Sequence, residues 1–230
     1  MVAPSPSTQV KRVRDTAEAA RALARYSVDE LAALIVKRIE GEPVHELPGL
    51  IRDEEPSSIF VEIARSPANV SLSNALRAAV VQLAGQFAHE PAFKKPHVAG
   101  EICFLCTSLD APAAIAPLIT LVSRDDAADI SVADGEDLRL RALVGLLGYH
   151  QDLRYNPGFA AALEPLLRSP KYKILSLTAL VGLWPERRSE LTKLASLSPD
   201  EESSLELSLE WSGFRREQSG AQVTGRSGAA

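Results

Sequence analysis

The chain of 230 residues is poor in the features that mark several common protein classes. Its two cysteines are too few for a framework of disulfides. Aromatic residues make up 5% of the chain, so a core must consist mainly of Leu, Ala, Val and Ile, as is typical of helices packed on helices. No apolar run approaches the ~18 residues that indicate a membrane span. The formal net charge of −5 disfavours non-specific binding to nucleic acid, which depends on a basic surface.

Catalytic and metal-binding motifs are also missing from the sequence. It contains no glycine-rich phosphate loop, no Ser-His-Asp order and no metal-binding helix motif. The first 15 residues lack the apolar stretch of a secretory signal, so we expect a cytoplasmic protein. The sequence therefore predicts no cofactor and no metal, and it favours a protein that is not an enzyme.

Most of the chain instead shows a helical pattern. With 46% hydrophobic and 24% charged residues, it can bury a continuous core and remain soluble. The segment that begins after Ser27 and ends at Gly41 has a typical cap at each end. We expect a single helical-repeat domain over residues 14–214, with capping helices at both ends. The polar composition of 1–13 and 215–230 predicts disordered tails.

Two kinds of segment recur within this pattern. The sequences AAIAPLI (113–119) and AALEPLL (161–167) match position by position, and each has a proline inside an apolar helical run, where proline kinks a helix. Very apolar segments lie at 79–85, 142–148 and 179–184. A kinked helix, a polar turn and a second apolar helix therefore recur as a unit. Units of roughly 20–50 residues are typical of solenoids of helix pairs.

The runs APLITLVSRDD…EDLRLRALVGLLGYH and LEPLLRSPKYKILSLTALVGLW resemble HEAT repeats. The resemblance extends over about 57–196 and implies an all-α fold, namely a short α-solenoid of antiparallel helix pairs (HEAT/armadillo-like). It implies a non-enzymatic scaffold or adaptor that binds a partner protein or peptide through a helix-lined face. Related arrays also include alkylpurine DNA glycosylases and bilin lyases, so an enzyme of this kind is the alternative. The basic and aromatic residues available to a glycosylase are Arg141, Tyr149, Trp184, Arg187 and Arg188.

Cys103 and Cys106 raise the question of a redox pair, half of a zinc site or part of a core. Zinc requires four ligands, and a redox pair is usually found at a helix N-terminus that follows a strand. Here the two cysteines lie among apolar residues in what reads as a helix interior. Because free cysteine is among the most buried residue types, we expect both side chains in the core.

The segment 125–137 carries six acidic residues, which raises the question of calcium binding. Their order does not follow a calcium-binding loop, and acidic residues before a helix commonly act as caps. The sequence thus favours a capping role for these residues, and whether the segment is functional stays open.

The second helices of successive pairs are expected to line one surface, which in solenoids binds partners. Aligning the three apolar segments predicts partner-binding residues exposed on one side: Gln82, Gln86, Arg141, Tyr149 and Glu186. The same alignment predicts Leu83, Val144, Leu146 and Val181 to be buried. Small residues in this stripe, such as Gly145 and Gly148, also suit close packing between helices, and both explanations stay open.

Overall fold

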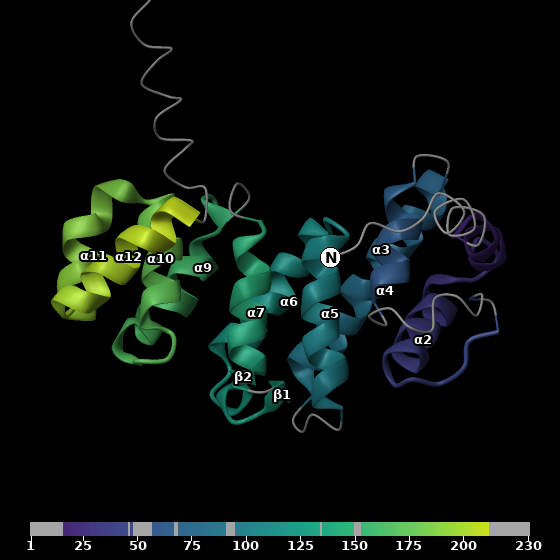
Figure 1. Cartoon of the computed structure of the whole chain (residues 1–230), viewed down its shortest axis with the longest axis horizontal. Helices are drawn as coiled ribbons and strands as arrows, with labels where there is room; N and C mark the ends of the chain where they lie inside the picture. Colours follow the sequence, from purple (N-terminus) through teal and green to yellow (C-terminus); the bar gives the residue numbers. More distant parts are fainter. Residues whose placement is uncertain are drawn as a thin grey trace, which may run out of the picture.

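The computed structural model describes residues 16–45, 47, 57–66, 69–90, 95–133, 135–149 and 153–211. These residues form an all-α protein, which confirms the predicted fold class (Figure 1). The predicted tails, 1–13 and 215–230, lie outside the described residues. Among the residues that are described, no helix is long and apolar enough to cross a membrane.

Helix α2 (Val28–Ile39) shows how local sequence sets a helix boundary. The backbone N–H of Glu30 donates to Oγ of Ser27 at 3.3 Å, and the Ser27 N–H donates to the Glu30 carboxylate at 2.7 Å. This capping box satisfies backbone donors that have no partner within the helix. Beyond the other end of the helix, Gly41 has a φ of +77°, a conformation that glycine adopts at little cost. Both boundaries agree with the sequence prediction.

The other elements follow in chain order, after a first helix over residues 16–23. The α-helices are α3 (Ser58–Arg65), α4 (Val70–His89), α5 (Pro96–Ser108), α6 (Ile115–Ser123), α7 (Leu138–Leu147), α9 (Pro157–Leu163), α10 (Lys173–Leu183), α11 (Arg188–Ala195) and α12 (Pro199–Trp211). Short 3₁₀ helices lie between them: η3 (Pro112–Ala114), η4 (Asp126–Ala128), η5 (Glu164–Arg168) and η6 (Pro185–Arg187).

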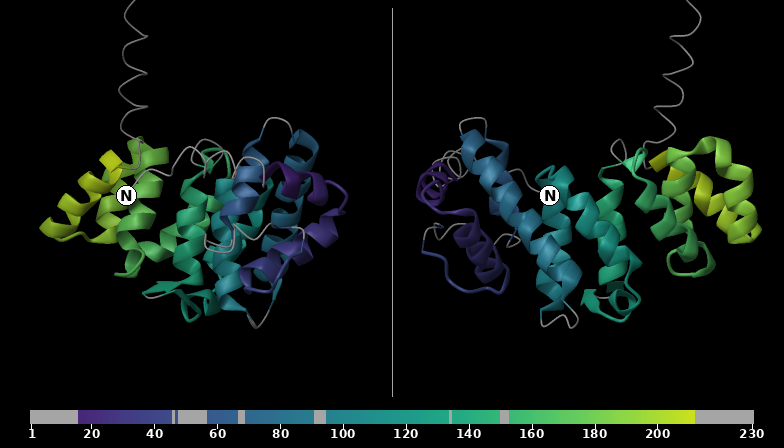
Figure 2. Two further views of the ribbon diagram at one scale, coloured as in Figure 1. Left: turned by 45° about the vertical axis from the view of Figure 1, so that its right-hand side comes forward. Right: turned by 180° about the vertical axis from the view of Figure 1, so that it is seen from behind.

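The helices from α4 onward pack in two rows along the long axis of the molecule (Figures 1 and 2). One row contains α4, α6, α9 with η5, and α11, and the other contains α5, α7, α10 and α12. Across the rows, α4 packs on α5, α6 on α7, and η5 on α10, while α2 and α3 pack against α4. This order of contacts is compatible with an α-solenoid. The solenoid itself and membership of the HEAT family stay predictions.

The two recurring prolines occupy different places in the helices. Pro117 lies in the first turn of α6, which directly follows η3, and Pro165 lies in η5, which directly follows α9. In both units the helical run therefore combines α and 3₁₀ geometry instead of forming one kinked α-helix. Proline is compatible with these places because it has no N–H to donate to the preceding turn.

The described parts of the acidic segment, residues 125–133 and 135–137, are folded onto the domain. After η4 they form an antiparallel ribbon of β1 (Ser131–Ala133) and β2 (Glu136–Asp137), with Gly135 at φ +75° in the turn. Val132 packs on α5 at Gly100, where a Cβ atom would lie 3.0 Å from the Cβ of Val132. The ribbon is therefore held against the row of helices that contains α5.

Candidate functional site: the outer face of α5 and α7

Helices α5 and α7 approach closely at Gly145 of α7 and at Gly148, which directly follows the helix. A Cβ atom at Gly145 would lie 3.2 Å from the carbonyl oxygen of Cys103 and 3.4 Å from Oγ1 of Thr107. The Thr107 hydroxyl donates to the Gly145 carbonyl at 2.8 Å. A Cβ atom at Gly148 would overlap the methyl group of Thr107. Glycine at these two positions therefore allows the helices to pack closely, which is one of the two explanations that the sequence offers.

The two cysteines belong to the core beside this contact. Cys103 and Cys106 are free and buried, with 1% and 0% of their surfaces exposed. Burial raises the pKa of Cys103 to about 12, although the charge of Arg141 acts in the opposite direction. Burial and the neighbouring Cys103 likewise raise the pKa of Cys106 well above its ordinary value. Both thiols are protonated at neutral pH, and the predicted core location is confirmed.

Several described carboxylates of the acidic segment 125–137 interact with neighbouring groups. Asp126 pairs with Arg124 at 2.5 Å, and Asp125 lies 3.3 Å from a guanidinium nitrogen of Arg139. The side chain of Asp137 caps α7, as its oxygen accepts from the Leu140 N–H at 2.7 Å. In the described part of the chain, no three His, Cys, Asp or Glu side chains are grouped so that they could hold a metal ion.

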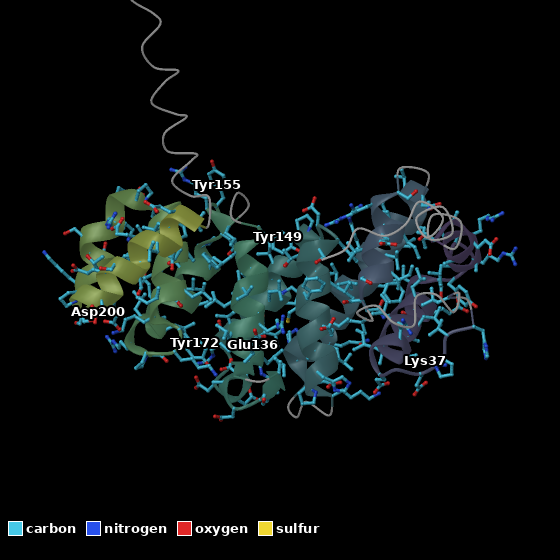
Figure 3. The ribbon with its side chains drawn as sticks, in the orientation of Figure 1. Lys37, Glu136, Tyr149, Tyr155, Tyr172 and Asp200 are labelled. Atoms are coloured by element: carbon cyan, nitrogen blue, oxygen red, sulfur yellow. The ribbon has the colours of Figure 1, made fainter. Side chains whose placement is uncertain are left out.

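The sequence predicts that Tyr149 is exposed, and this prediction is wrong. Its side chain is 4% exposed, and the hydroxyl donates to the Cys106 carbonyl and accepts from the Ala111 N–H at 3.3 Å. Tyr149 thereby connects the end of α7 to the end of α5. The repeat alignment extended helical spacing past Leu147, but α7 ends there and the chain turns, so residue 149 points inward. Figure 3 shows Tyr149 at this end of α7 and Glu136 at the other.

The remaining predicted binding residues are exposed at least in part, but they are spread over the molecule. Gln82 and Gln86 line a groove of about 460 Å³ between α2 and α4, where Gln82 donates to Asp29 at 2.8 Å. Arg141 lies on α7, with a guanidinium nitrogen 2.6 Å from Glu136, and Glu186 is exposed in η6. Only the two glutamines line a common groove, so the predicted five-residue site is not assembled as expected.

The burial predictions succeed at three positions and fail at one. Leu83, Leu146 and Val181 are buried, as expected, whereas Val144 is 51% exposed. Val144 precedes Gly145, the point of contact with α5, and consequently lies about 100° around α7 from it. This rotation places the valine on the outer side of the helix. The alignment did not reveal this orientation because α7 carries apolar residues on every side.

Phe104 occupies the corresponding place on α5. It follows Cys103, which faces α7 together with Thr107, and it is 39% exposed. Gly145 contacts Cys103, and Gly148 contacts Thr107, so the contacts follow the same chain order and the two helices run in parallel. Phe104 follows a contact residue of α5, whereas Val144 precedes one of α7. In parallel helices these two positions point to the same side. The partly exposed Leu140 and Leu147 lie one turn before and after Val144. The α5–α7 patch consists of Phe104, Leu140, Val144 and Leu147.

On its other side, α7 contacts α10 through polar groups. Asp137 is 3% exposed; it accepts from the Tyr172 hydroxyl at 2.7 Å and lies 2.5 Å from the Lys171 ammonium. The guanidinium of Arg139 lies 5.5 Å from the centre of the Tyr172 ring. Burial and the hydrogen bond to Asp137 raise the pKa of Tyr172 well above its ordinary value. These groups form a polar joint beside the ribbon, where Figure 3 shows Glu136 and Tyr172 close together.

The arginines that a base-processing enzyme would need are engaged elsewhere. Arg187 pairs with Glu164 at 2.9 Å and with Glu190 at 2.7 Å, and Arg188 pairs with Glu206. Together with the burial of Tyr149, these ion pairs leave the suggested glycosylase residues without a common groove in the described structure.

Comparison with known proteins identifies no relative of this chain. No family model, no curated protein and no solved structure matches it. The resemblance to HEAT repeats thus stays a prediction.

Proposed function

We propose that this protein is a non-enzymatic interaction scaffold that binds a partner protein or peptide through the α5–α7 patch. The observation that supports the proposal is the exposure of Val144 and Phe104 on the same side of two neighbouring helices. Single exposed apolar residues are common in soluble proteins, but apolar residues that gather on one face mark interaction surfaces. Because about half of each side chain is already buried, covering the rest would contribute on the order of 1 kcal/mol each.

The composition of α7 supports the same proposal. Its inner side buries Ala142, Leu143 and Leu146, while its outer side presents Leu140, Val144 and Leu147. Apart from Arg139 and Arg141, every residue of α7 is apolar or glycine, and such a helix is normally covered over most of its surface. In the described structure the outer side of α7 has no such cover at Val144, and a partner would provide it.

The backing of the patch also suits binding. Close contact at Gly145, the Thr107 hydrogen bond and the Tyr149 anchor hold α5 and α7 together without the partner. Rigid surfaces lose less conformational entropy on association, so more of the contact free energy appears as affinity.

The proposal is tested by introducing the same charge at two exposed valines. Val144→Glu places a carboxylate in the patch, whereas Val70→Glu places one on α4, where Val70 is 64% exposed. Both variants should keep the melting temperature within a few degrees, because surface changes usually alter stability by about 0.5 kcal/mol or less. Proteins captured by the wild type should be retained by Val70→Glu and lost by Val144→Glu.

Site-specific crosslinking identifies the contact directly. A photoreactive amino acid at position 104 should crosslink to the same captured protein, and one at position 70 should not. If Val144→Glu captures the same proteins as the wild type with unchanged affinity, the patch is not the binding surface. The enzymatic alternative stays a prediction that no observation in the described residues favours.

A further inference from the structure

A second surface lies at the far end of the molecule, between α11 and α12. These helices are joined by a short turn at 196–198, but they separate to leave a groove of about 570 Å³. Leu197 and Pro199 provide its accessible apolar lining, while Leu205 is 1% exposed. The polar lining consists of Thr192, Ser203, Glu202 and the ion pair of Arg188 with Glu206. Leu207, one turn beyond Ser203 on α12, is 57% exposed. The groove and this leucine offer apolar surface that no described part of the chain covers.

The charge on this surface is mainly negative, although Arg188 of α11 also lines the groove. Helix α12 carries Asp200, Glu201, Glu202, Glu206 and Glu210 and has no basic residue. Two of these carboxylates are neutralised by neighbours, since Glu201 pairs with Lys173 at 2.9 Å and Glu206 with Arg188. Glu202 lines the groove and is exposed, and no cation of the described residues pairs with it. A positively charged group in the groove would therefore gain a partner.

We propose that the α11–α12 groove docks a basic, apolar segment of a partner protein. Apolar side chains of that segment would cover Leu197, Pro199 and Leu207, and a Lys or Arg would pair with Glu202. An acidic segment would be repelled by α12, and this repulsion gives the groove its selectivity for basic partners. The hydroxyls of Thr192 and Ser203 donate to carbonyls of their own helices, so binding does not have to break hydrogen bonds between helices.

This site is separate from the α5–α7 patch. Figure 3 shows Asp200, in the first turn of α12, at the opposite end of the molecule from Lys37, with α7 between them. The groove is built from other helices, so a variant of one surface leaves the other intact. The two proposals can accordingly fail independently.

A pair of synthetic peptides tests the charge preference on the full chain. The first is a short amphipathic peptide with leucines at helical spacing and lysines between them, and the second has each lysine replaced by glutamate. Fluorescence anisotropy should show saturable binding of the lysine peptide and at least about tenfold weaker binding of the glutamate peptide, equivalent to 1.4 kcal/mol. Equal binding of the two peptides, or binding of neither, would overturn the proposal.

Two matched pairs of variants locate the peptide. Ser203→Trp fills the groove, whereas Ser204→Trp adds the same side chain at an exposed neighbour that does not line it. Glu202→Lys reverses the charge inside the groove, and Asp200→Lys makes the same change on the first turn outside it. Ser203→Trp and Glu202→Lys should weaken the binding of the lysine peptide about tenfold, and the two control variants should weaken it much less. If Asp200→Lys weakens binding as strongly as Glu202→Lys, the attraction is diffuse and the groove is not the site. Val144→Glu should leave peptide binding unchanged.

Discussion

Helix α7 is held in different ways on its two sides. Toward α5 the contact is close and extensive, with the backbone of Gly145 against that of Cys103. Toward α10 the direct helix contact is slight, and the polar joint of Asp137, Lys171 and Tyr172 connects the two elements. The difference shows that residue size sets how closely two neighbouring helices approach. Where large charged side chains occupy the contact, hydrogen bonds and ion pairs replace apolar packing.

The two contacts should also respond differently to mutation. A close-packed contact cannot accept added volume, because neighbouring backbone atoms have no space into which to move. A polar contact tolerates a change in volume but not the loss of a buried partner, because the remaining group is left without a hydrogen bond. Three changes test these expectations, in order of their expected loss of stability, from the largest to the smallest.

The largest effect is expected from Gly145→Leu. A side chain at this position would meet the carbonyl oxygen of Cys103 and the hydroxyl of Thr107, so α5 and α7 would have to separate. We expect the free energy of unfolding to fall by about 3 kcal/mol in urea denaturation, at the upper end for an overpacked contact. Val144→Leu, at the adjacent exposed position, is the control and should change stability by about 0.5 kcal/mol or less. Equal stability of the two variants would contradict a close contact at Gly145.

An intermediate effect is expected from Asp137→Ala at the polar joint. The change removes the cap of α7 and leaves the buried Tyr172 hydroxyl without its acceptor, at a cost of about 2–3 kcal/mol. Tyr172→Phe removes only the hydroxyl and should cost about 1 kcal/mol. In the double variant the two costs should not add, because both changes break the same hydrogen bond. Fully additive costs in chemical denaturation would show that the two groups do not interact.

The smallest effect is expected from replacing both Cys103 and Cys106 with alanine. The loss of two small buried groups should lower stability by about 1–2 kcal/mol through residual cavities. In the native wild type, labelling by a thiol reagent at neutral pH should be much slower than in the unfolded chain, since burial keeps both thiols protonated. Rapid native-state labelling would contradict this location.

The buried thiols should also make the stability of the protein depend on pH. The folded state raises the pKa of Cys103 from 9.0 to about 12, so the buried thiol keeps its proton while the unfolded chain loses it. Its contribution to stability is therefore complete below pH 9 and declines between pH 9 and 12. The wild type should lose stability more steeply than the cysteine-free variant over that range. Parallel curves from pH 9 upward would argue against a raised thiol pKa.

The sequence was sufficient for features that depend on spacing along one helix. The ends of α2 follow from Ser27 and Gly41, and the cysteines could be placed in the core because apolar residues surround them on a helical segment. The alignment of the three apolar segments also predicts the buried Leu83, Leu146 and Val181. Such features are predictable because hydrogen bonding and burial repeat with the helical period.

Features that depend on a neighbour were decided only by the tertiary structure. Helix α7 has apolar residues around most of its circumference, so its sequence does not indicate which side faces α5, and Val144 lies on the outside. Tyr149 follows the last residue of α7 by two positions, where the chain has left the helical path and the hydroxyl reaches Cys106. Glycine suits both a binding surface and a close contact, and only the position of Thr107 in space distinguishes them at Gly145 and Gly148. The sequence of a helix determines where the helix begins and which residues prefer burial. The neighbour that covers each side of the helix is determined by the packing of the whole domain.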